Sequence, residues 1–135
     1  MMPALPTAIA EAVASYPARA RQSFDAIRVM IHQEAERLDV GRLNETLKWG
    51  EPAFLTDATR AGTTIRVAWK RKLPDVIGVY VHCQTALVDA WRGRFPDLRL
   101  DGNRALLLPL ENDLPVDALK SCISDALTYH RGKRA

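Results

Sequence analysis

The side chains with the clearest chemical potential lie in two stretches, 63–70 and 76–83, where apolar residues occupy every second position. That period is typical of a strand with one buried face, so the residues in between must point the other way. They include two permanent cations, a phenol and an imidazole: Arg66, Lys70, Tyr80 and His82. Such groups on neighbouring strands can bind a carboxylate or a phosphate. We therefore predict an anion-binding patch on this sheet face, with Lys48 and Trp49 at its rim; a solvated polar face is the alternative.

Trp49 and Glu45 belong to a segment, 42–49, whose leucines lie about one helical turn apart. We expect a short helix there, ended by Gly50 in a left-handed conformation. Trp49 would then stack on a ligand or, in the alternative, fill the core at the corner between helix and strand. Glu45 is expected to form a surface ion pair with Lys48, and a buried Glu45 that accepts backbone hydrogen bonds is the alternative.

Other residues of reactive types favour structural roles. His32 is expected on the surface of a helix, and Cys83 and Cys122 in the core, since both cysteines lie on apolar faces. The sequence contains no Cys-x-x-Cys pair, so a structural zinc site is not expected. Neither a nucleophile–base pair nor a cluster of metal ligands stands out, and we predict no catalytic residue, no metal ligand and no cofactor.

Length and composition narrow the class of protein. The chain has 135 residues, of which 47% are apolar and 26% are charged, as in one ordinary globular domain. Its net charge of +3, from 19 basic and 16 acidic residues, does not by itself indicate a nucleic-acid partner, although a clustered basic face would. The sequence shows neither a secretory signal nor an apolar run long enough to span a bilayer. We therefore expect a cytoplasmic protein, with neither a membrane nor a nucleic acid as partner.

The elements that must position these residues follow from apolar spacing and from the places of proline and glycine. Helices are predicted at 7–15, from Pro17 onward, at 42–49, at 85–94, and from Asn112 or Asp113 to Gly132. Strands are predicted at 53–56, 63–70, 76–83, 98–100 and 104–108.

The order of these elements predicts the fold class. Three helices, three strands, a helix, two strands and a last helix make one α+β domain over residues 1–135. Short connections favour an antiparallel or mostly antiparallel sheet of about five strands, and the alternating faces favour helices packed on one side of it. A frayed tail is expected at 131–135.

The run Glu-Thr-Leu-Lys-Trp-Gly-Glu-Pro-Ala-Phe at 45–54 resembles the central signature of the YdhG-like family, a domain-of-unknown-function family of small bacterial proteins. Shorter supporting matches at 64–70, 81–85, 102–105 and 122–130 extend the resemblance over about residues 16–130. The resemblance implies a compact α+β domain and brings no established catalytic residue. One branch of that family is frataxin-like and delivers iron through exposed acidic clusters, whereas this chain is more similar to a mostly uncharacterised branch.

Two classes of function follow from the residues and the resemblance. The first is a non-catalytic binding module for a small anionic ligand or a protein partner. The alternative is a metal-handling protein that binds or delivers iron in the frataxin-like manner. An enzyme comes third, because no nucleophile–base pair or cluster of metal ligands is visible along the chain. Catalytic groups can converge in space from distant positions, so this absence does not remove the class.

Overall fold

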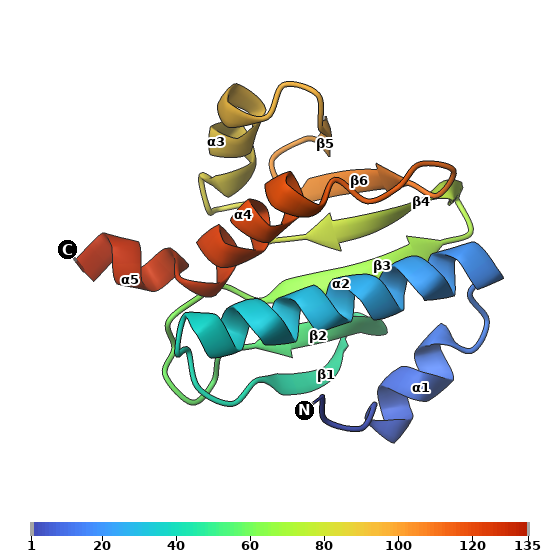
Figure 1. Ribbon diagram of the computed structural model, residues 1–135, viewed down its shortest axis with the longest axis horizontal. Coiled ribbons are helices and arrows are strands. Elements are labelled where there is room, and N and C mark those ends of the chain that lie inside the picture. Colours follow the sequence, from blue (N-terminus) through green and yellow to red (C-terminus); the bar gives the residue numbers. More distant parts are fainter. Residues whose placement is uncertain (1, 135) are drawn as a thin grey trace.

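A six-stranded antiparallel sheet forms the centre of the fold in the computed structural model, which describes residues 2–134 (Figure 1). Its strands are β1 (Asn44–Lys48), β2 (Glu51–Leu55), β3 (Ile65–Lys70), β4 (Leu73–Tyr80), β5 (Arg99–Asp101) and β6 (Ala105–Pro109). They lie side by side in the order β1-β2-β3-β4-β6-β5. The predicted α+β class and antiparallel sheet are therefore confirmed, with six strands in place of about five.

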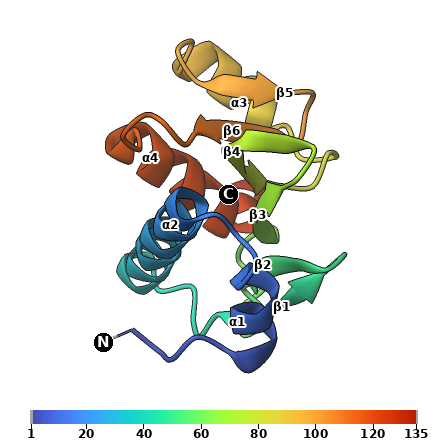
Figure 2. The same cartoon turned by 90° about the vertical axis from the view of Figure 1, so that its right-hand side faces the viewer.

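Helices cover one face of this sheet. They are α1 (Thr7–Val13), α2 (Ala18–Arg37), α3 (Leu87–Arg94), α4 (Val116–Leu127) and α5 (Tyr129–Arg134). Figure 2 shows α2 and α4 on one side of the strands, while the other side carries no helix of the described residues. None of the helices within residues 2–134 is long and apolar enough to cross a membrane.

The core lies between the helices and the sheet. Its fully buried side chains come from α2, α4 and the central strands, and they include Phe24, Ile27, Ile31, Ile65, Val67, Ile77, Leu119 and Ile123. The apolar stripe of α2 recurs every three or four residues and that of β3 every second residue, which is why each element buries one face only. The alternation predicted for 63–70 and 76–83 thus points the apolar set toward the helices.

The predicted helix at 42–49 is wrong, because this segment forms β1. A two-residue turn, Trp49-Gly50, joins β1 to β2, and both residues have positive φ, 56° and 75°. Positive φ at both central positions is the turn geometry that matches the twist of a hairpin. Residues four apart share a face in a strand as they nearly do in a helix, so the leucine spacing could not separate the two.

Several predicted boundaries also differ from the structure. β4 already begins at Leu73, where a turn was expected through residue 75. The helices α1 to α4 all begin after residues whose side chains make no capping hydrogen bond: Pro6, Pro17, Ala86 and Pro115. The expected frayed tail largely coincides with α5, and residue 135 lies outside the described residues.

Candidate functional site

Arg66 and Tyr80 lie directly opposite each other on β3 and β4, on the sheet face that the helices leave uncovered. The Arg66 guanidinium carbon is 5.3 Å from the centre of the Tyr80 ring, and the Lys70 ammonium nitrogen is 4.3 Å from it. Both distances are those of cation–π contacts. The structure therefore brings three of the predicted patch residues together around one aromatic ring.

The Tyr80 ring is held flat against the strand by a glycine. A side-chain carbon built at Gly78 would lie 2.5 Å from three atoms of this ring, so no other residue fits there without moving it. Around the ring are small and apolar side chains of the same face: Ala68, Val76, Ala105 and Leu107. Tyr80 is only 7% exposed, which gives the two cations above it a low-dielectric base.

Glu51 is the site residue that the sequence reasoning missed. Its carboxylate accepts a hydrogen bond from Arg66 Nη1 at 2.6 Å, and its other oxygen lies 3.2 Å from Lys70 Nζ. All three side chains are partly exposed, at 17% for Glu51, 20% for Arg66 and 41% for Lys70. One carboxylate offsets only one of the two positive charges, so this group keeps a net charge of +1. We call Glu51, Arg66, Lys70 and Tyr80 the open-face cluster.

Lys48 and Trp49 lie beside this cluster at the tip of the β1–β2 hairpin. Lys48 is the pairing partner of Glu51, which places its charge at the edge of the cluster. Trp49 is 91% exposed, so the alternative of a core aromatic is wrong. Figure 2 shows the hairpin tip curling away from the helices, on the side of the uncovered face. Lys48 therefore lies at the edge of the cluster and Trp49 in the exposed turn, and their part in binding an anion stays a prediction.

His82 stands apart from the other predicted patch residues. It follows the end of β4, is exposed, and accepts a hydrogen bond at Nδ1 from the backbone N–H of Gln84 at 3.0 Å. Its carbonyl accepts from the Thr85 hydroxyl. Within residues 2–134, no ring contact or hydrogen bond joins His82 to Arg66, Lys70 or Tyr80. The predicted alternation placed His82 on the same face as Tyr80. However, β4 ends at Tyr80, so His82 lies beyond the strand.

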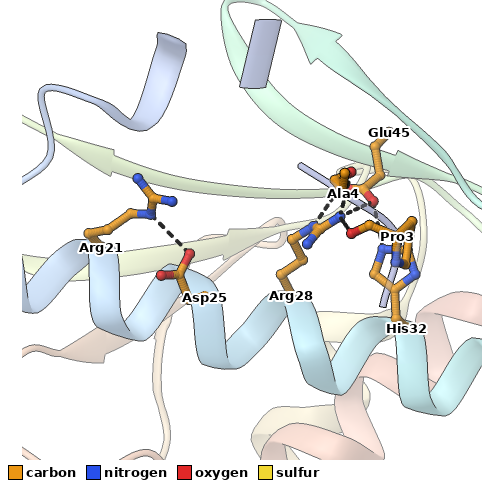
Figure 3. A network of polar contacts seen from close by, with 7 residues as sticks. All are labelled: Pro3, Ala4, Arg21, Asp25, Arg28, His32 and Glu45. Carbon is orange, nitrogen blue, oxygen red and sulfur yellow. Dashed lines mark hydrogen bonds and ion pairs between the residues drawn. The ribbon is translucent and has the colours of Figure 1, made fainter. Parts of the chain in front are cut away.

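A second ionic network lies on the helix side of the same hairpin (Figure 3). Arg28 donates two hydrogen bonds of 2.8 Å to the Glu45 carboxylate, and His32 Nε2 lies 2.7 Å from Glu45 Oε1. Arg28 also donates to the carbonyl oxygens of Pro3 and Ala4. The expected Glu45–Lys48 surface pair is thus wrong, and His32, only 15% exposed in its side chain, does not lie free on the surface.

The pKa of Glu45 reflects this pairing. Burial of the carboxylate raises its pKa, but the hydrogen bonds and positive charge supplied by His32 and Arg28 outweigh burial and lower it to about 2. Glu45 therefore stays ionised through the whole neutral range. We call Arg28, His32 and Glu45 the buried cluster.

The buried cluster borders a surface hollow of about 1110 Å³ between the N-terminal segment and α2. A carboxylate beside an imidazole is a common element of acid–base sites. His32 contacts the Glu45 carboxylate and the Phe54 ring, and among the described residues no serine, threonine or cysteine side chain forms a hydrogen bond with it. Within the same part of the chain, no three His, Cys, Asp or Glu side chains come together as a metal site would require.

The two cysteines differ from each other. Cys122 is buried, and burial followed by the nearby Asp125 charge raises the pKa of its thiol to about 12. Its predicted core role is confirmed. Cys83 is exposed in the turn after β4, so its predicted core role is wrong. That prediction failed because β4 ends three residues earlier than the apolar alternation indicated.

Comparison with protein-family models, with curated proteins and with solved structures gave no match to this chain. The resemblance to the YdhG-like family therefore stays a prediction from the sequence.

Proposed function

We propose that this protein is a non-catalytic binding module for an anionic ligand, which it holds on the open-face cluster. The observation that carries the proposal is the incomplete charge balance there: two cations share the single carboxylate of Glu51. Lys48, opposite Glu51 in the hairpin, adds a further positive charge at the edge. An incoming phosphate or carboxylate would complete the balance.

The cluster is built to present its cations. The Tyr80 ring holds the Arg66 guanidinium in position before a ligand arrives, which reduces the entropy lost on binding. The guanidinium has five N–H donors, and its hydrogen bond to Glu51 leaves several of them for an anion. The apolar base beneath Tyr80 strengthens the attraction by lowering the local dielectric constant.

Calorimetric titration with inorganic pyrophosphate at low ionic strength tests the proposal. The wild-type chain should bind saturably, and Arg66→Gln with Lys70→Gln should weaken binding by about tenfold or more, because two charge-assisted hydrogen bonds are lost. The matched control is Arg42→Gln with Lys120→Gln, which removes the same charge away from the open face.

The control should bind like the wild type. Thermal unfolding of all three proteins separates lost binding from lost folding. No saturable binding by the wild-type chain, or an equal loss in the control, would contradict the proposal.

A further inference from the structure

Four basic residues lie in or beside two turns, one of which also holds the exposed Trp49. Lys48 precedes the β1–β2 turn, and Lys70, Arg71 and Lys72 lead into and form the β3–β4 turn. Because β1 to β4 are consecutive antiparallel neighbours, both turns lie at the same end of the sheet. Lys48, Arg71 and Lys72 are exposed. We call Lys48, Trp49, Lys70, Arg71 and Lys72 the basic end.

The basic end and the adjoining strand carry a local excess of positive charge. Segments 48–51 and 66–75 hold five basic residues and two acidic ones, an excess of three. The net charge of the complete chain is also +3, so the remaining residues balance to zero. A modest overall charge therefore conceals a clustered basic face, which is the arrangement that nucleic-acid binding requires.

Trp49 is placed where neither burial nor backbone preference explains an indole. At 91% exposure it gains almost nothing from the hydrophobic effect. Its φ of 56° lies in the left-handed region, where the first position of such a turn favours Asn, Asp or Gly. A large aromatic side chain in a strained and exposed position indicates a role at the surface.

We infer that the anionic ligand is a single-stranded nucleic acid, an inference that rests on the proposed function. A base stacks on the Trp49 indole, and the neighbouring phosphates lie against Arg66 and the cations of the basic end. Stacking on an exposed aromatic beside a basic track is the common mode of single-strand binding, since every base has a flat face. A duplex hides those faces, and an acidic peptide has no need of a stacking platform.

The shape of the surface favours a strand over a free nucleotide. The two best-defined surface hollows of residues 2–134 include no residue of the open-face cluster or the basic end, and small molecules are usually enclosed. The stretch of β3 from Arg66 to Lys70 extends over about 13 Å, long enough to follow two or three phosphates. Contacts spread along a chain can supply affinity without a pocket.

Fluorescence titration with an oligothymidylate of about eight nucleotides tests this inference. Trp49 is the most exposed of the tryptophans, so quenching of Trp49 fluorescence reports stacking. Trp91 is fully buried, and the Trp69 indole N–H donates a hydrogen bond to the Pro74 carbonyl. The oligothymidylate should bind about tenfold tighter than an abasic oligomer of equal length and charge. Arg71→Gln with Lys72→Gln should remove about one phosphate contact or more. The slope of log affinity against log salt concentration should become shallower by about that number.

Trp49→Asn is the decisive variant, because asparagine suits the left-handed turn and keeps the hairpin folded. It should lose the tenfold preference for bases and retain the affinity for pyrophosphate. Trp49→Phe should keep part of the preference.

Equal binding of the abasic oligomer, or of an oligoglutamate of equal charge, would overturn the single-strand inference while leaving the anion-binding proposal intact. If free thymidine monophosphate bound as tightly as the oligothymidylate, the inference that the ligand is a strand and not a free nucleotide would be overturned. Absence of pyrophosphate binding would overturn the proposed function itself.

Discussion

The two ionic clusters of this protein lie on opposite faces of one hairpin, and in each of them one carboxylate pairs with two basic side chains. Glu45 of β1 points toward the helices and Glu51 of β2 points away from them. The Glu45 carboxylate is 5% exposed, and its partners Arg28 and His32 are 10% and 15% exposed. Around Glu51 the cations are 20% and 41% exposed, within reach of a ligand.

The difference lies in what covers each cluster. Carbonyl oxygens of Pro3 and Ala4 accept further hydrogen bonds from Arg28 Nη2, so the N-terminal segment packs against the buried cluster. The open-face cluster has no such cover, and its second cation has no carboxylate of its own. Under the proposed function, the buried cluster stabilises the fold and the open-face cluster holds the anion.

Glu45→Ala should give the largest effect on stability. Removing the carboxylate leaves the Arg28 guanidinium buried without its charge partner, which costs about 3–5 kcal/mol of unfolding free energy. Glu51→Ala should cost about 1 kcal/mol or less, because its partners can turn to solvent. Urea denaturation of both variants measures the difference. Equal losses would remove the distinction between the clusters.

The acid stability of the protein should depend on Glu45. Its folded pKa of about 2 lies below the ordinary value of 4.5, so its contribution is present above pH 4.5 and is lost as the pH falls toward 2. The linked free energy is about 3 kcal/mol over that window. As the pH is lowered from 6 to 2, the denaturation midpoint of the wild type should therefore fall steeply. The midpoint of Glu45→Gln should fall less steeply over the same range. A wild-type slope retained in that variant would contradict this assignment.

Gly78→Ala should perturb the open face more gently. The added methyl group would meet the Tyr80 ring at 2.5 Å, which should cost about 1–3 kcal/mol and weaken pyrophosphate binding by displacing the ring from under Arg66. Gly93→Ala on α3 is the control, because nothing lies within 4 Å of its added carbon. That control should be neutral or slightly stabilising, as alanine favours a helix. Unchanged binding in Gly78→Ala would show that Tyr80 does not position the cations.

The sequence predicted those parts of the site that depend on local alternation. Arg66 and Tyr80 share a face because each lies between apolar neighbours, and the period of two survives in the folded sheet. The same reasoning failed for His82, since it could not locate the end of β4. The helix predicted for the segment with Trp49 was also wrong. A hairpin turn and a helix end both use a glycine with positive φ, so Gly50 could not separate the two.

The contacts of both carboxylates could not be predicted, for a related reason. Glu45 pairs with Arg28 across 17 residues and Glu51 with Arg66 across 15, distances along the chain that no periodicity reports. Assigning 42–49 to a helix also hid the alternation that sends Glu45 and Glu51 to opposite faces. With β1 recognised as a strand, that separation would have followed from the pairing of Lys48 with Glu51.

The most direct test of the account compares pyrophosphate affinity in Glu51→Gln and Glu45→Gln. Glu51→Gln removes the carboxylate that competes with the ligand for Arg66 and Lys70, so affinity should rise about fivefold over the wild type. Glu45→Gln lies on the other face and should leave affinity unchanged in conditions where it is folded. A fall in affinity on Glu51→Gln, or an equal change in both variants, would contradict the claim that the open-face cluster is the binding site.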